Sequence, residues 1–164
     1  SSFNRILRKE DFRFEGRERR PPRNMINALI SFGNSLLYAT VLGEIYKTHL
    51  DPRIGFLHTV NSRRFSLVMD VADVFKPVIP DRVIFRLGNK GMIGPRDFRR
   101  EAEGVFLNER GKRKFLKEYE ARLRSTIRLR GRKRSYAGVV RADLLRLERH
   151  LIGELEYEPF VARW

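Results

Sequence analysis

The sequence contains no cysteine, and this absence excludes several kinds of site. Without thiols the chain can form no disulfide, no thiolate zinc site and no cysteine nucleophile. Any metal ion would have to be held by oxygen atoms and by one or more of the three histidines. The lack of cysteine fits a reducing compartment, and we expect a cytoplasmic protein without a signal peptide or a membrane-spanning helix.

Acidic residues are scarce beside the basic ones. The 164 residues include 35 Lys and Arg but only 20 Asp and Glu, which gives a net charge of +15. A charge imbalance of this size says little about the fold, but it indicates that the protein binds polyanionic partners. Hydrophobic residues make up 41% of the chain, which is enough for one packed domain of this length and excludes general disorder.

The positive charge is concentrated between Arg110 and Arg134. This stretch holds twelve basic and two acidic residues and so carries +10 of the total. A run of this kind can be a solvated helix face that keeps a protein soluble. Its charge density favours a nucleic-acid surface instead. An anionic membrane is a weaker alternative, because the stretch lacks the Trp, Phe and Leu face of an interfacial helix.

Strand-like alternation is almost absent, whereas apolar residues recur at intervals of three and four. We therefore expect an all-α fold, an irregular bundle of six or seven helices. Residues 1–24 should hold the end of an upstream helix and a basic, proline-containing link, and residues 25–164 a single all-α domain. The pattern predicts helices over residues 25–48, 66–77, 80–88 and 95–107, and two longer helices across residues 115–151 with Gly131 between or within them.

One histidine and two aspartates form the constellation with the most chemistry. His58 lies in a glycine-containing loop, and Asp70 and Asp73 follow three residues apart, on one face of a predicted helix. Imidazole with carboxylates suits Mg²⁺ or Mn²⁺, which could polarise a phosphate for phosphodiester cleavage or transfer. From the spacing alone, a structural histidine beside two solvated aspartates is the more common explanation.

Four segments of the sequence match the motifs of one family, in the order that the family has them. They are RERRPPRNMINALISFGNSLLY at residues 17–38, DPRIGFLH at 51–58, SLVMDVADVFKP at 66–77 and YEPFVARW at 157–164. Together they extend over essentially the whole chain, which thus resembles the CRISPR adaptation integrase, CRISPR-associated protein one.

The resemblance implies an all-α catalytic domain that, in the family, follows a smaller β-rich domain. It implies a divalent-metal-dependent DNA endonuclease and integrase that joins the 3′-OH ends of short DNA to a CRISPR repeat during spacer acquisition. Matched to this sequence, His58 and Asp73 are the ligands of Mg²⁺ or Mn²⁺. Asp70 is the aspartate that supports the catalytic site, and Lys76 lies close to the DNA. The implied partners are prespacer and repeat DNA, a second copy of the protein in a homodimer, and CRISPR-associated protein two.

The third metal ligand of the family is a glutamate on a helix upstream of the basic link. Glu10, Glu15 and Glu18 fall too late in the sequence to match it. We therefore expect a C-terminal fragment that lacks the β-rich domain and one ligand. We do not expect full catalysis from this chain alone.

The residues expected to bind DNA are basic and lie near the metal-site motifs and in the charged stretch. They are Arg63, Arg64, Lys76, Arg110, Lys112, Arg113, Lys114, Arg128, Arg130, Arg132 and Lys133. Two other functions fit the same sequence. One is a non-catalytic basic DNA-binding or scaffold domain in which Asp70 and Asp73 are structural, and the other is an RNA-binding accessory protein, which charge alone supports.

Overall fold

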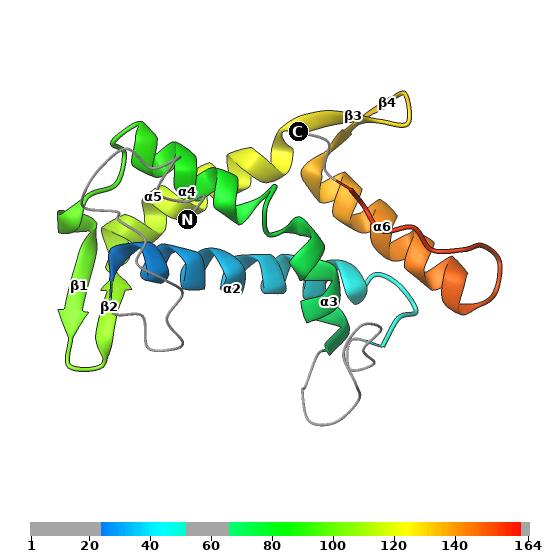
Figure 1. The fold of residues 1–164 in the computed structure, drawn as a ribbon, viewed down its shortest axis with the longest axis horizontal. Helices are drawn as coiled ribbons and strands as arrows, with labels where there is room; N and C mark the ends of the chain where they lie inside the picture. Colours follow the sequence, from blue (N-terminus) through cyan, green and yellow to red (C-terminus); the bar gives the residue numbers. More distant parts are fainter. Residues whose placement is uncertain (1–23, 52–65, 162–164) are drawn as a thin grey trace. The chain divides into compact units, whose positions relative to one another are not determined.

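The computed structural model describes residues 24–51 and 66–161 and is mostly helical (Figure 1). Its α-helices are α2 (Met25–Ile45), α3 (Ser66–Phe75), α4 (Pro80–Asn89), α5 (Glu109–Arg124) and α6 (Tyr136–Leu151). A short 3₁₀ helix, Pro95–Asp97, precedes the hairpin of β1 (Phe98–Glu101) and β2 (Gly104–Leu107). A second hairpin pairs β3 (Thr126–Leu129) with β4 (Arg132–Ser135).

The described residues group into two compact units. Unit 1 contains residues 24–35 and 80–122, and unit 2 contains residues 36–51, 66–79 and 123–161. Helices α2 and α5 each contribute residues to both units. The candidate metal-site aspartates and the β3–β4 hairpin therefore belong to unit 2, whereas most of α5 belongs to unit 1.

Helix α2 begins at the predicted N-cap, where the Asn24 side chain accepts a hydrogen bond of 2.9 Å from the Asn27 N–H. The helix has no charged residue from Met25 to Gly43, and by length and composition it could cross a membrane, which the sequence interpretation overlooked. A core helix of a soluble protein meets the same criteria. Seven apolar side chains of α2 are buried within the protein, as in a core helix: Ile26, Ala28, Leu29, Ile30, Leu37, Val41 and Ile45.

Unit 1 packs the first part of α2 against α4 and α5. The rings of Phe32 and Phe115 meet edge to face with their centroids 5.3 Å apart. A Cβ atom on Gly33 would come within 2.9 Å of both the Phe115 ring and the Pro80 side chain. Glycine at this position thus allows α2 to approach both neighbouring helices closely.

Unit 2 joins α3, α6 and the segment that follows α6. The Ser135 side chain caps α6 by accepting a hydrogen bond of 3.1 Å from the Gly138 N–H. Phe160, in the segment after α6, stacks on Phe75 of α3 with ring centroids 5.3 Å apart and an interplanar angle of 7°. This stack fastens the C-terminal segment to the helix that carries Asp70 and Asp73.

The sequence predictions for α2, α3, α4 and α6 agree with the structure to within a few residues. In each case an apolar helical stripe was bounded by a capping residue, a proline or a glycine. The structure confirms a mostly helical fold, with five α-helices among residues 24–51 and 66–161. The six or seven helices expected for the whole chain are not confirmed. The two hairpins depart from the all-α expectation.

The helix predicted over residues 95–107 is wrong. The structure has a 3₁₀ turn and then antiparallel strands in which Phe98 pairs with Leu107 and Glu101 with Gly104. Val105 and Leu107 are buried while Phe106 between them is half-buried, which is the period of two that a strand imposes. Short apolar runs fit both periods, and here tertiary burial selected the strand.

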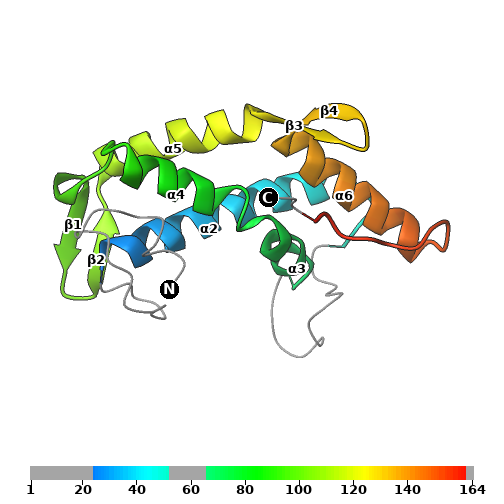
Figure 2. The ribbon, with the colours of Figure 1, turned by 45° about the horizontal axis from the view of Figure 1, so that its top comes forward.

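The second correction concerns residues 126–135, where the sequence interpretation left Gly131 between or within two helices. Arg130 and Gly131 both have positive φ angles, 49° and 78°, and they connect β3 to β4. A two-residue loop with this conformation suits the twist of a β-hairpin, and glycine adopts it without strain. Figure 2 shows the hairpin leading directly into α6.

Candidate functional site

Helix α3 holds the two candidate aspartates in different environments. Asp70 is buried, with 3% of its surface exposed, and it lies among the buried apolar residues of α3. Asp73, three residues later, keeps 46% of its side chain exposed. Of the two carboxylates, Asp73 is therefore the one that a ligand in solvent can reach, and Asp70 belongs to the interior.

Lys76 follows Asp73 and contacts it directly. Its ammonium donates a hydrogen bond of 2.5 Å to Asp73 Oδ1 and lies 5.3 Å from the centre of the Tyr38 ring on α2. Burial disfavours the charged form, but the hydrogen bonds with Asp73 and Tyr38 outweigh that effect and hold the pKa of Lys76 above its usual value. The side chain therefore stays cationic at the edge of the candidate site.

Three of the predicted site residues, His58, Arg63 and Arg64, lie outside the described residues. Within residues 24–51 and 66–161, no three His, Asp or Glu side chains come together as a group that could hold a metal ion. The structure thus places Asp70 and Asp73 on α3 and Lys76 directly after it. The metal site formed by His58 and Asp73 stays a prediction.

The chemistry of the donors fits a hard divalent ion. Asp73 offers an accessible carboxylate, and imidazole with carboxylate oxygen is a donor set that Mg²⁺ or Mn²⁺ accepts. Lys76 already neutralises part of the charge on Asp73, so an ion bound there would compete with the ammonium for the same carboxylate. Asp73 and His58 are the residues that would hold it.

A buried carboxylate that the sequence interpretation missed anchors the C-terminal segment. Asp143 on α6 accepts a hydrogen bond of 2.7 Å from the Tyr157 hydroxyl and one of 3.1 Å from the Phe160 N–H. Burial raises the pKa of Asp143, although these two donors oppose the rise. Burial and the neighbouring Asp143 also raise the pKa of Tyr157, so its hydroxyl keeps the proton that it donates. Through Phe160 this network reaches Phe75 on α3.

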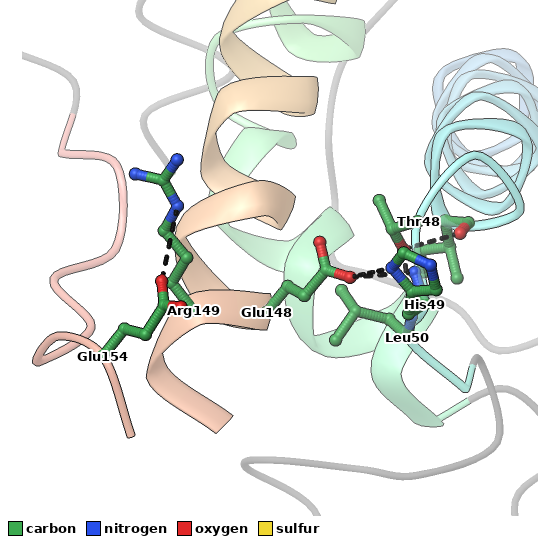
Figure 3. A network of polar contacts seen from close by, with 7 residues as sticks. Thr48, His49, Leu50, Glu148, Arg149 and Glu154 are labelled. Atoms are coloured by element: carbon green, nitrogen blue, oxygen red, sulfur yellow. Dashed lines mark hydrogen bonds and ion pairs between the residues drawn. The ribbon is translucent and has the colours of Figure 1, made fainter. Parts of the chain in front are cut away.

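A second polar network fixes the chain just before residues 52–65. After α2, His49 places its backbone N–H 3.0 Å and its Nδ1 2.8 Å from Glu148 Oε1 on α6 (Figure 3). The hydrogen bonds from the backbone and ring of His49 lower the pKa of Glu148. His49 is thereby occupied by a structural contact. His150, the third histidine, lies 3.2 Å from the Tyr157 amide nitrogen and supports the C-terminal segment.

Three of the seven basic residues of α5, Arg110, Lys112 and Lys114, form ion pairs with acidic residues. Asp97 is 1% exposed, and the Lys114 ammonium donates to its Oδ2 at 2.8 Å while Arg110 Nε lies 2.8 Å from its Oδ1. Burial raises the pKa of Asp97, but Lys114, the Gly94 N–H and Arg110 together lower it below the usual value. Lys112 donates to Glu109 at 2.9 Å. These α5 charges thus have a structural role, which the sequence run alone did not reveal.

The basic residues of the β3–β4 hairpin differ from those of α5. Arg130 lies 3.3 Å from Glu158. For Arg128, Arg132, Lys133 and Arg134, no acidic side chain within residues 24–51 and 66–161 lies at ion-pair distance, and all four are exposed. The charged stretch predicted from sequence therefore includes three cations on α5 that are paired with acidic residues and four cations on the hairpin that, within the described part of the chain, are not.

The structure defines a mostly helical, basic domain with two aspartates on α3, and comparison with known proteins gives its family. Residues 1–121 match the family described as CRISPR associated protein Cas1. The chain therefore belongs to the Cas1 family, and the resemblance found in its four motifs is confirmed.

Curated relatives agree along the whole chain. CRISPR-associated endonuclease Cas1 2 of Thermodesulfovibrio yellowstonii is 53% identical over 99% of this chain and 50% of its own length. CRISPR-associated endonuclease Cas1 of Clostridium perfringens is 50% identical over 99% of this chain and 51% of its own length. The chain spans about half the length of these relatives.

Solved structures share the fold. A CAS1 protein from Thermotoga maritima superposes with a TM-score of 0.84 at 49% identity, over 93% of this chain and 49% of that chain. A casposase bound to integration product gives a TM-score of 0.86 at 24% identity, over 96% of this chain and 47% of that one. The second likeness concerns the fold alone.

Proposed function

We propose that the protein acts as a divalent-metal-dependent DNA endonuclease and integrase in CRISPR spacer acquisition. The observation that carries the proposal is the match along 99% of the chain to relatives named Cas1 endonucleases. The position of an accessible Asp73 on α3 beside Lys76, which directly follows the helix, supports it, because that is where the motif resemblance places a metal ligand and a cation near DNA. A metal ion held at such a position would polarise the phosphate for cleavage or for 3′-OH attack, and a nearby cation would bind a phosphate.

The proposed roles of Asp70, Asp73 and Lys76 follow from the accessibility and contacts of each side chain, and that of His58 follows from the motif resemblance alone. His58 and Asp73 hold Mg²⁺ or Mn²⁺, which when bound offsets the charge that develops on the attacked phosphate. Asp70, which is buried, helps to fix α3 so that Asp73 points outward. Lys76 stays protonated and binds a nearby DNA phosphate.

The proposed partners are prespacer and repeat DNA, a second copy of the protein, and Cas2. The motif resemblance implies all three. Two fold neighbours, at 20% identity, were solved in complexes that contain Cas1 and Cas2. The proposed location is the cytoplasm, because the lack of cysteine fits a reducing compartment.

Strand transfer tests the function. We would incubate the full gene product that contains this chain with a short prespacer duplex and a labelled repeat duplex, with and without Mn²⁺, and follow the joined product on a denaturing gel. His58→Ala and Asp73→Ala should each abolish the product and leave DNA binding intact, because they remove ligands and no phosphate contact. Glu101→Ala, which removes an exposed carboxylate in unit 1, is the matched control and should retain activity.

Strand transfer that persists in either ligand variant would refute the assigned metal site. A wild-type protein that binds DNA with no Mn²⁺-dependent product would favour the alternative, a non-catalytic DNA-binding or scaffold domain. A direct measurement on the 164-residue chain is Mn²⁺ binding by loss of the free-ion EPR signal, with Asp73→Ala beside it. Weak binding that the variant loses would support Asp73 as a ligand.

A further inference from the structure

The β3–β4 hairpin concentrates positive charge on a small, simple element. Five of the ten residues from Thr126 to Ser135 are basic and none is acidic. The basic residues are Arg128, Arg130, Arg132, Lys133 and Arg134. Because all five are exposed, the hairpin presents a dense cationic surface to solvent.

The register decides which cations share a face. Arg128 is directly opposite Lys133, and residues opposite each other in an antiparallel pair project to the same side. Leu129 is opposite Arg132 and Ile127 opposite Arg134, and both apolar side chains are half-buried. The face that carries Arg128 and Lys133 is thus exposed to solvent, and we call it the open face. The opposite face contacts the rest of the protein through Ile127 and Leu129. Arg130 lies in the loop that joins the strands.

This arrangement is unfavourable unless an anion binds to it. Like charges directly opposite each other destabilise a strand pair, and the Arg128–Lys133 pair is of this kind. The chain supplies acidic partners elsewhere: Asp97 and Glu109 compensate Arg110, Lys114 and Lys112 on α5. Among the residues that the structure describes, it supplies none to Arg128, Lys133, Arg132 or Arg134.

We propose that the β3–β4 hairpin is the element that grips duplex DNA, with its open face and loop in the major groove and its cations on the phosphate backbone. The inference rests on the proposed function and names the surface that holds the DNA. It also assigns the paired cations of α5 to the stability of unit 1 rather than to DNA binding.

Three features select duplex DNA as the occupant. The major groove of B-DNA is wide enough to admit a two-stranded β-ribbon, whereas the major groove of A-form RNA is too narrow. The residues from Thr126 to Ser135 include no aromatic side chain, so the hairpin offers no platform on which unpaired bases could stack. Arg and Lys contacts to phosphate position a duplex without reading its sequence, so the binding should depend steeply on salt and little on sequence.

The test compares two double variants that remove equal charge. Arg128→Gln with Lys133→Gln neutralises the open face of the hairpin. Lys112→Gln with Arg113→Gln removes Lys112, which pairs with Glu109, and the exposed Arg113 beside it, and is the charge-matched comparison on α5. The affinity of the 164-residue chain for a short fluorescein-labelled duplex of arbitrary sequence would be measured by anisotropy over a series of NaCl concentrations. Melting curves of each protein show whether it is folded.

The hairpin variant should bind more weakly, and the slope of log K against log salt should fall by about 2, one for each lost phosphate contact. The α5 variant should keep the wild-type slope. Equal losses in both variants would mean that net charge alone acts, and an unchanged hairpin variant would mean that the DNA lies elsewhere; either result overturns the inference while leaving the proposed function intact. Absence of DNA binding by the wild-type 164-residue chain would refute the inference, and the strand-transfer assay on the full gene product would still test the proposed function separately.

The same titrations with double-stranded RNA and with single-stranded DNA identify the occupant. The proposal predicts that the chain binds double-stranded RNA and single-stranded DNA more weakly than duplex DNA, and that the hairpin variant changes these two affinities little. Binding of either one as tight as that of the DNA duplex, and equally sensitive to the hairpin variant, would contradict it. A melting temperature of the hairpin variant at or above the wild-type value excludes unfolding as the cause of lost binding.

Discussion

At the scale of single residues, two helical glycines have opposite roles. Gly111, in the first turn of α5, is so close to its surroundings that a Cβ atom would lie 2.3 Å from the Asp97 carbonyl oxygen and 2.7 Å from the Leu107 side chain. Gly43, near the end of α2, is exposed, and a Cβ atom at this position would meet no other atom within 4 Å. The first glycine is therefore required by packing and the second is not.

Alanine substitutions should separate these roles. Gly111→Ala should destabilise the chain by about 1–3 kcal/mol, because the backbone oxygen it meets cannot move aside cheaply. Gly43→Ala should stabilise it by about 0.5–1 kcal/mol, because alanine favours the helix and restricts the unfolded chain. Urea unfolding of the three proteins measures both changes. A stabilising Gly111→Ala would show that α5 and the hairpin β1–β2 are less closely packed than described.

Asp97 predicts how the stability of the fold responds to acid. Burial raises the pKa of Asp97, but Lys114, Gly94 and Arg110 outweigh burial and hold the folded pKa of Asp97 below its unfolded value of about 3.9. The ionised carboxylate therefore stabilises the protein above that pH, and this contribution is lost as the pH falls through the folded pKa. Asp97→Asn should cost about 1–3 kcal/mol near neutral pH, and the difference from wild type should narrow below about pH 4.

Unfolding free energies of the two proteins from neutral pH to about pH 2 check this behaviour. A difference that stays constant with pH would show that the effect of Asp97→Asn is one of shape and hydrogen bonding rather than of charge. The exposed pair of Arg99 and Glu101 provides a control, because an exposed ion pair contributes little. Glu101→Gln should leave the pH dependence almost unchanged.

At the scale of elements, the C-terminal segment acts as a strap over α6 and α3. Tyr157→Phe removes the hydroxyl that donates to the buried Asp143 and leaves a carboxylate oxygen without that donor. The variant should lose about 1–3 kcal/mol. Because Phe160 connects the same network to Phe75, the amides of α3 should also exchange faster with solvent. Hydrogen exchange followed by mass spectrometry measures the second effect.

Tyr46→Phe is the control for this variant, because Tyr46 is 68% exposed after α2. It should change neither stability nor exchange in α3. If Tyr157→Phe lowers stability but leaves the exchange of α3 unaltered, the hydrogen bonds of Asp143 stabilise only the C-terminal segment. The link from Asp143 to the candidate site would then be refuted.

At the scale of the whole molecule, the distribution of charge matters more than its total. The net charge of +15 indicates a polyanionic partner but does not say where that partner binds. Part of the excess is balanced by Asp97 and Glu109 in unit 1, and part is left open on the β3–β4 hairpin in unit 2. A run of charge in a sequence thus divides, once folded, into ion pairs that stabilise the chain and cations available to a ligand.

The sequence by itself determined the family, the main helices and the positions of the candidate metal ligands. These features depend on local signals: the Asn24 cap, the prolines that bound α3 and α4, and motifs that are contiguous in the chain. Asp70 and Asp73 could be placed on one helix because the apolar pattern of residues 66–77 predicts that helix, and a spacing of three makes the two residues neighbours on it.

The tertiary structure decided the features that depend on residues far apart in sequence. Val105 and Leu107 form a strand because burial, not local preference, selects the period of two. Asp97 meets Lys114, and Asp143 meets Tyr157 and Phe160, only after the chain has folded, and no local pattern encodes such contacts. Whether a lysine or arginine is paired or open is likewise a property of its neighbours in space. That is why the charged stretch was visible in the sequence, while its division between α5 and the β3–β4 hairpin was not.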